Sequence, residues 1–200
     1  MIKILIFDFG GVYFTFNYKK LINKLSRELK VSFIIAEQAW NSKLSEFEKG
    51  KISEKDYLVT FIKVLNKEVN PNKIRKIIIR HFKPIEETLK LVDSLKKNYC
   101  VGMLSNQTDW IYMIDSEYDF LRKFSPVIIS RDVGFQKPSK KIYLALMKKI
   151  NFLPNEVLFI DDSPDFCKAA SRLGIQTIIY KNPKQLRFEL VSKGIRLENE

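Results

Sequence analysis

Short apolar runs recur along the chain, and most of the segments between them have helical spacing. The first run, residues 2–7 (IKILIF), is almost wholly apolar, as expected for a parallel strand covered on both faces. Similar runs lie at 99–104, 126–130, 156–160 and 175–180. The pattern therefore predicts five short strands.

Three segments beyond residue 80 carry apolar residues on one helical face. They span 85–97, 139–150 and 163–174; the second opens at Pro138-Ser139 and the third ends at Gly174. Strands that alternate with helices of about ten to fifteen residues are typical of βαβ units. We therefore predict an α/β fold with a doubly wound parallel sheet.

The alternation fails between the first and second strands. This stretch reads as four successive helices, at 17–29, 32–48, 53–67 and 71–81. A helical insertion after the first strand is the simplest interpretation, with HFKP at 81–84 as the return. We predict a helical cap subdomain at 16–82 and an α/β core domain formed by 1–15 and 83–200.

Length and composition agree with one core domain that carries an insertion. The chain has 200 residues, of which 46% are hydrophobic, so it can bury a sizeable core. Cys100 and Cys167 match no metal-binding spacing and are expected to be buried thiols. Few cysteines, no signal peptide and no apolar run long enough to cross a bilayer predict a cytoplasmic protein.

The net charge is the one unusual quantity. Lys and Arg number 35 against 23 Asp and Glu, which gives +12. Because the basic residues are spread along the chain, a general compositional bias explains them first, and attraction of anionic substrates remains open. We expect a small phosphorylated molecule as partner, no nucleic acid and no membrane, and a monomer or homodimer.

Polar residues follow four of the predicted strands. Asp8 follows the first, Ser105-Asn106 the second and Asp161-Asp162 the fourth, and Lys137 lies in the loop after the third. Ligands of open parallel sheets bind beyond the carboxyl ends of the strands, so these side chains are candidates for one site. Two adjacent acids beside a buried edge would repel each other unless a cation lay between them. A turn at Asp8 and a helix cap at Ser105 are the structural alternatives.

Four motifs in order give the chain a family likeness: FDFGGV, LSNQ, GFQKPSKKIY and LFIDDSPDFCKAASRLGI. Together they resemble the haloacid dehalogenase superfamily, and the likeness covers almost the whole chain. The segment FEKGKISEKDYL within 16–82 is similar to small helical caps of its sugar-phosphatase branch. The chain also resembles the α-glucose-1-phosphate phosphatase branch, in which a glycine stands two residues after the nucleophile.

The resemblance implies a Mg²⁺-dependent phosphatase of small phosphorylated metabolites, most plausibly sugar phosphates. Asp8 would be the nucleophile and form an aspartyl-phosphate that water hydrolyses. The residues implied to bind phosphate are Ser105, Asn106 and Lys137, with backbone N–H groups of the turn that contains Gly10 and Gly11. The implied Mg²⁺ ligands are Asp8, the carbonyl of Gly10 and Asp162, with Asp161 as a further ligand or acting through water.

Two positions depart from the family pattern. Most phosphatases of the superfamily carry an acid–base Asp where this chain has Gly10, and many have Asn in place of Phe166. Three hypotheses follow: a phosphatase that acts without that Asp, a weak or inactive relative that binds a phosphorylated ligand or protein partner, and a haloacid dehalogenase. The paired Asp161-Asp162 favours Mg²⁺ and argues against the dehalogenase. Phe14, Phe16 and Trp40 would either line the substrate pocket or belong to the subdomain core.

Overall fold

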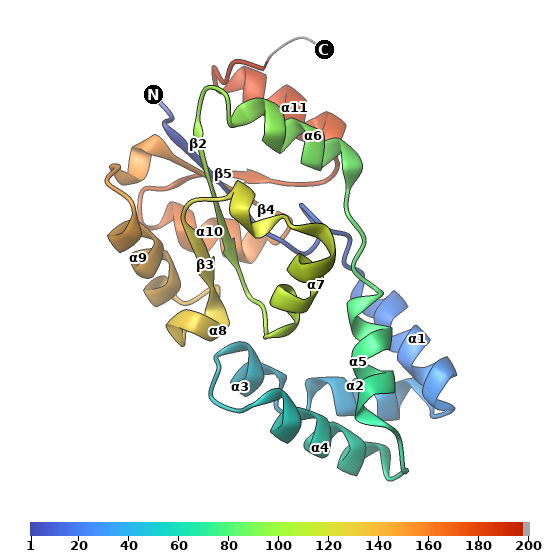
Figure 1. Cartoon of the computed structure of the whole chain (residues 1–200). Helices are drawn as coiled ribbons and strands as arrows, with labels where there is room; N and C mark the ends of the chain where they lie inside the picture. The colour runs from blue at the N-terminus through green and yellow to red at the C-terminus, as the bar shows by residue number, and fades with distance from the viewer. Residues whose placement is uncertain (198–200) are drawn as a thin grey trace.

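A five-stranded parallel sheet forms the centre of the molecule in our computed structural model, which describes residues 1–197. The strands are β1 (Ile4–Phe7), β2 (Cys100–Ser105), β3 (Val127–Ile129), β4 (Val157–Asp161) and β5 (Gln176–Ile179), in the order β3-β2-β1-β4-β5. All five predicted strands are confirmed. The connections run outward from β1 on one side and then on the other, so the order reverses between β1 and β4 (Figure 1).

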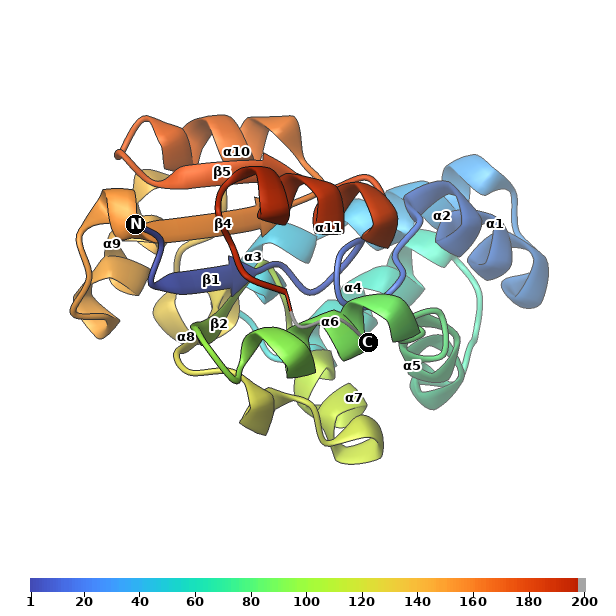
Figure 2. The same cartoon turned by 90° about the horizontal axis from the view of Figure 1, so that it is seen from above.

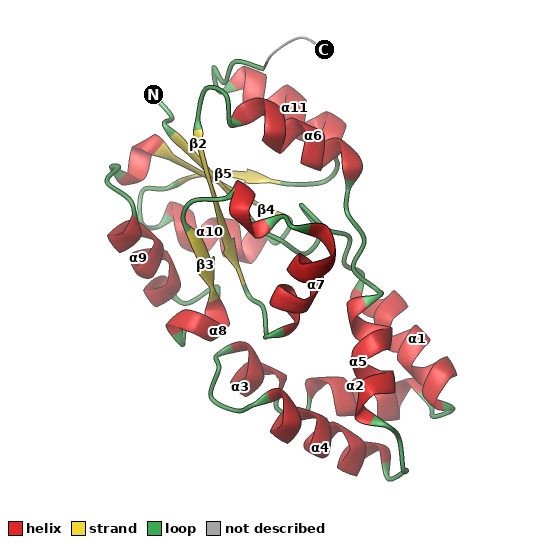
Figure 3. Ribbon diagram, in the orientation of Figure 1, coloured by secondary structure: helices red, strands yellow, loops and turns green. Residues whose placement is uncertain are grey.

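Helices cover both faces of this sheet, as a doubly wound fold requires (Figures 2 and 3). Successive side chains of a strand point to opposite faces, so Leu5 and Phe7 join one apolar cluster and Ile4 and Ile6 the other. The first cluster includes α6 (Glu86–Leu95), α7 (Trp110–Tyr118) and α11 (Pro183–Ser192), and the second includes α9 (Lys140–Lys149) and α10 (Pro164–Ser171).

The predicted core helices 85–97, 139–150 and 163–174 correspond to α6, α9 and α10. Ser139 caps α9, since its side chain accepts a hydrogen bond from the N–H of Lys141. The sequence analysis missed α7, α11 and the short α8 (Ser130–Val133). In α11 only Leu186 and Leu190 are buried, which leaves too weak an apolar repeat to recognise. Two short 3₁₀ turns, Leu121–Lys123 and Pro154–Glu156, complete the core.

Five helices occupy the segment between β1 and α6: α1 (Tyr18–Leu29), α2 (Phe33–Asn41), α3 (Leu44–Glu48), α4 (Glu54–Leu65) and α5 (Pro71–Ile79). The prediction of one helix over 32–48 was wrong. The chain leaves the helix after Asn41, where the Ser42 hydroxyl bonds the Ala39 carbonyl and Lys43 takes a left-handed conformation with φ 88°. This break redirects α3 toward the core, beside α8 (Figure 1).

The helical segment is joined to the core at several points. Glu54 of α4 accepts a hydrogen bond from Trp110 Nε1 at 2.6 Å and holds Arg75 of α5 through both its oxygens. At the return, Phe14 forms a bridge with Pro84, and the N–H of Thr15 donates to the Lys83 carbonyl. These contacts agree with a cap at 16–82 on a core of 1–15 and 83–200, a division that we retain as a proposal.

The two cysteines differ in their surroundings. Cys167 is buried, as expected, whereas Cys100 is exposed at the start of β2, so the expectation of two buried thiols was wrong for Cys100. The first residue of a strand can lie outside the helical layers even when the rest of the strand is covered. None of the described helices combines the length and the apolar character needed to span a membrane.

We predict that Gly102→Ala destabilises the sheet. Gly102 lies opposite Ile6 in β1, and an added Cβ would stand 2.8 Å from both Ile6 Cδ1 and the Pro126 carbonyl oxygen. Because packed interiors resist such insertions, the free energy of unfolding should fall by about 1–3 kcal/mol. Urea unfolding measures this change, and an unaltered midpoint would contradict the close approach of these strands.

Candidate active site

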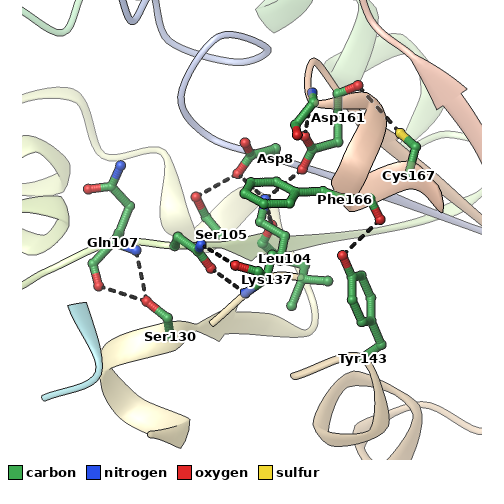
Figure 4. Close-up of polar contacts among 12 residues, drawn as sticks. Asp8, Leu104, Ser105, Gln107, Ser130, Lys137, Tyr143, Asp161, Phe166 and Cys167 are labelled. Atoms are coloured by element: carbon green, nitrogen blue, oxygen red, sulfur yellow. Dashed lines mark hydrogen bonds and ion pairs between the residues drawn. The ribbon is translucent and has the colours of Figure 1, made fainter. Parts of the chain in front are cut away.

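The predicted site residues come together at the carboxyl ends of the central strands. Asp8 directly follows β1, Ser105 ends β2 and Asp161 ends β4. The strand order reverses between β1 and β4, which is where open α/β sheets bind their ligands. Figure 4 shows these side chains converging with Lys137, which comes from the loop after α8.

Lys137 lies at the centre of this cluster and is 1% exposed. Its ammonium Nζ is 2.9 Å from Asp8 Oδ1 and 2.6 Å from Asp161 Oδ2, and it donates to the Leu104 carbonyl at 3.2 Å. Burial lowers the pKa of Lys137, but the charges of Asp8 and Asp161 outweigh it, so that the pKa is raised. The lysine is therefore charged and held at a fixed place beside both acids.

Asp8 is oriented by two donors on the same oxygen. Its Oδ1 accepts a hydrogen bond from Ser105 Oγ at 2.6 Å in addition to the contact with Lys137 (Figure 4). Among the residues that the structure describes, nothing bonds Oδ2, and Asp8 lines the cavity described below. One oxygen is thus anchored while the other stays available for a ligand or for attack on one.

Asn106 makes its contacts with the backbone of Lys137. Its Nδ2 donates to the Lys137 carbonyl at 3.0 Å, and its Oδ1 accepts from the Lys137 N–H at 2.8 Å. This pair of bonds fixes the loop that delivers the ammonium to Asp8. Asn106 lines the cavity as well, where the second hydrogen of its amide remains for a bound anion.

Three carboxylates form a group suited to a metal ion. Oxygens of Asp8, Asp161 and Asp162 lie within 4.8 Å of one another. Burial and the charge of Asp8 raise the pKa of Asp161 to about 7 and also raise the pKa of Asp162. Such shifts indicate an excess of negative charge that a cation would relieve, and an all-oxygen donor set fits Mg²⁺.

The two adjacent acids differ in what they offer a metal. Both oxygens of Asp161 are engaged, Oδ2 by Lys137 and Oδ1 by the N–H of Ser163 at 2.8 Å. Asp162 is exposed and lines the cavity. The geometry therefore favours Asp162 as a direct ligand and Asp161 as a residue that acts through water or holds the lysine.

Gly10 and Gly11, which follow Asp8 closely in the chain, have different surroundings. Gly10 lines the cavity. Gly11 has φ +86°, and a Cβ there would stand 2.2 Å from Asp162 Oδ2, so the acidic loop requires a glycine at this place. The N–H of Gly11 is donated to the Phe14 carbonyl at 2.7 Å, so Gly11 gives room to Asp162 and its N–H is already occupied.

A cavity of about 560 Å³ opens over these residues. Its wall includes Phe16 and Trp40, two of the aromatic residues considered from sequence, whereas Phe14 is fully buried in the core. Phe166 also lines it, and its ring centroid lies 5.0 Å from Lys137 Nζ. The polar and aromatic wall residues that sequence reasoning missed are Glu48, Phe82, Gln107, Thr108, Trp110 and Gln136.

Part of this omission was avoidable. Gln107 and Gln136 directly neighbour recognised motif residues, Asn106 and Lys137, so their adjacency was a usable signal. Glu48 lies in the segment FEKGKISEKDYL, but that likeness assigned it no role, and its position against the core depends on the unpredicted break between α2 and α3.

Comparison with known proteins gives consistent results. Residues 5–180 match the family model described as haloacid dehalogenase-like hydrolase. The chain is 24% identical over 203 residues to a D-ribitol-5-phosphate phosphatase of Bacteroides thetaiotaomicron, a similarity that spans 95% of this chain and 97% of that protein.

Solved structures share the fold. A haloacid dehalogenase family enzyme of Bacteroides thetaiotaomicron, in complex with magnesium and inorganic phosphate, superposes with TM-score 0.80 at 24% identity, over 91% of this chain and 96% of that one. The L-2-haloacid dehalogenase of Xanthobacter autotrophicus superposes with TM-score 0.66 at 19% identity, over 98% and 85%. At these identities the likeness establishes the architecture.

We predict that millimolar MgCl₂ raises the thermal unfolding midpoint of the protein and that Asp162→Asn removes most of this rise. An ion that binds the folded state stabilises it by mass action, and Asp162 is the carboxylate of the group with free access to the cavity. Differential scanning fluorimetry with and without Mg²⁺, at matched ionic strength, measures both effects.

Asp165→Asn is the matched control, since it removes an exposed carboxylate from the same segment outside the acidic group. It should keep the response of the wild type. A response to Mg²⁺ that survives Asp162→Asn unchanged would contradict the assignment.

Proposed function

The chain belongs to the haloacid dehalogenase-like hydrolase family, and we propose that it is a Mg²⁺-dependent phosphatase of small phosphorylated metabolites, with sugar phosphates as the preferred class. The observation that carries the proposal is the arrangement of Asp8, with one oxygen held by Ser105 and Lys137, beside a carboxylate group at the mouth of a cavity. The D-ribitol-5-phosphate phosphatase named above supports the reaction class.

In the first step Asp8 attacks phosphorus, the bond from phosphorus to the leaving oxygen breaks, and an aspartyl-phosphate forms. Ser105 and Lys137 hold Oδ1, which leaves Oδ2 to act as the nucleophile. Fixing the carboxylate before the substrate arrives lowers the entropic part of the barrier. In the second step water attacks the same phosphorus and releases phosphate and the free carboxylate of Asp8.

The negative charge of the carboxylates means that the site needs a bound cation for this reaction. Three carboxylates surround one ammonium, so the site repels a phosphate until it gains positive charge. Asp8, Asp162 and the carbonyl of Gly10 would hold Mg²⁺, with Asp161 as a further ligand or through water. The bound ion would supply charge neutralisation for the phosphoryl oxygens. Asn106 would hold those oxygens with its second amide hydrogen. Ser105 and Lys137, whose hydrogens are engaged with Asp8, Asp161 and the Leu104 carbonyl, would have to release a donor to join it.

The cavity supports a small polar substrate. Its volume of about 560 Å³ is in the range of metabolite pockets, and the wall combines amides with aromatic rings. Gln107 and Gln136 offer donors and acceptors to hydroxyl groups, while Phe16 and Trp40 offer apolar faces to the carbon skeleton. The free state of both described cysteines supports a cytoplasmic location for this activity.

The second candidate function is a weak or inactive relative that binds a phosphorylated ligand. Gly10 favours it, because the position of the family's usual acid–base group carries no side chain. A positioned acid–base group contributes about 10²–10⁴-fold to the rate, so its loss without replacement would leave slow turnover.

We predict that the protein releases phosphate from p-nitrophenyl phosphate and from members of a sugar-phosphate panel in the presence of Mg²⁺. Asp8→Asn should lower kcat by at least about 10⁴-fold, because losing a covalent nucleophile removes the chemical route itself. A colorimetric phosphate assay measures both proteins. Asp93→Asn, which removes an exposed carboxylate on α6, is the control and should leave kcat unchanged.

Each other outcome selects another hypothesis. Turnover that survives Asp8→Asn would exclude Asp8 as the nucleophile. Mg²⁺ binding without turnover on any substrate would favour the binding protein, and halide release from a 2-haloacid without metal would favour a dehalogenase.

A further inference from the structure

One ionisable side chain of the cavity has no part in the scheme above. Among the residues that the structure describes, those lining the cavity include four ionisable side chains: Asp8, Glu48, Lys137 and Asp162. Three of them belong to the nucleophile, its lysine and the acidic group. Glu48 remains, and it comes from the helical segment rather than from the sheet.

The fold holds Glu48 at this place by contacts on both sides of its helix. Ser130 Oγ of α8 donates to the Glu48 carbonyl at 2.6 Å and accepts from the N–H of Gln107 at 3.0 Å. Ser45 Oγ, on the same short helix α3, donates to Gln136 Oε1 at 2.9 Å. Helix α3, which lies beside α8 (Figure 1), is therefore linked through Ser130 to the loop after β2 and through Ser45 to the loop that carries Lys137.

The carboxylate of Glu48 is not used in a structural contact. Within the described part of the chain it has no hydrogen bond and no ion pair, whereas its neighbour Glu46 pairs with Lys43. Burial and the charge of Asp8 raise the pKa of Glu48 to about 7, against the opposing charges of Lys137 and Lys49. Both protonation states are consequently accessible near neutral pH, which suits a group that gives and takes a proton.

The charged residues of the helices that pack against α3 either form ion pairs with residues other than Glu48 or lie outside the cavity wall. Glu54 of α4 is paired with Arg75, and Arg131 of α8 is paired with Asp109. Neither Glu37 of α2 nor Asp132 of α8 lines the cavity. The charges that act on Glu48 are thus those of Asp8, Lys137 and the neighbouring Lys49.

We propose that Glu48 is the general acid and base of the phosphatase reaction and takes the part that Gly10 cannot play; this inference rests on the proposed function. In the first step the Glu48 carboxyl gives its proton to the leaving alcohol oxygen as the bond from phosphorus to that oxygen breaks. In the second step the Glu48 carboxylate takes a proton from the attacking water as the bond from phosphorus to Asp8 breaks, which restores the acid.

The test compares Glu48→Gln with the wild type on two leaving groups. A sugar phosphate releases a basic alkoxide that needs a proton, whereas p-nitrophenyl phosphate releases a stable phenolate that does not. Glu48→Gln should lower kcat for the sugar phosphate by about 10²-fold or more. With p-nitrophenyl phosphate it should give a burst of phenolate equal to the enzyme concentration, followed by slow turnover, because only the second step still lacks its base.

Two further variants separate catalysis from structure. Glu46→Gln, on the same helix, is the matched control and should behave as wild type. The double variant Gly10→Asp with Glu48→Gln should hydrolyse the sugar phosphate about tenfold faster, or more, than Glu48→Gln alone. An added Cβ at Gly10 meets only ordinary contacts, 3.4 Å to Phe16 Cβ and 3.9 Å to Gln107 Nε2, so the first atom of the new side chain is accommodated.

The outcomes distinguish failure of the Glu48 role from failure of the proposed phosphatase function. A wild-type protein that hydrolyses neither substrate would contradict the proposed phosphatase function itself. An active wild type with an equally active Glu48→Gln variant would overturn the role of Glu48 alone. If kcat fell equally on both substrates, with no burst and no restoration by Gly10→Asp, Glu48 would have a structural part only. That result would also overturn its proposed acid–base role.

Discussion

Lys137 is buried between Asp8 and Asp161, and the site is built around this contact. An ammonium group loses its hydration on burial, and here two carboxylates and the Leu104 carbonyl replace it. The contact ties the ends of β1 and β4 to the loop before α9, whose backbone is fixed in turn by Asn106. The contacts that satisfy the buried lysine thereby also orient Asp8, the proposed nucleophile.

Local charge in the site is opposite to the charge of the whole protein. The chain carries +12, yet its cavity combines Asp8, Glu48 and Asp162 with a single lysine. Under the proposed function, the basic residues would attract anions from a distance, while a phosphate in the site would still need a cation beside it. Burial and the charge of Asp8 therefore raise the pKa values of Asp161 and Asp162, although the chain as a whole is basic.

The helical segment contributes an ionisable side chain to the cavity as well as part of its wall. Its α2–α3 break brings Glu48 against the core, and Ser130 links that residue to the loop beyond Ser105. A chain that lacks a side chain at position 10 can thus place a carboxylate in the cavity from another element. Under the proposed function, substrate selection and proton transfer would then depend on the same helix.

The sequence by itself determined the sheet, the helical insertion and the residues at the strand ends, because period, strand length and family motifs are local properties. It identified Asp8, Ser105, Lys137 and the acidic pair, all of which meet in one place. Only the tertiary structure decided which oxygens are free, that Asn106 holds the Lys137 backbone, and that Glu48 faces the cavity. These depend on contacts between segments far apart in the chain, and on a left-handed residue at Lys43 that no periodic pattern encodes.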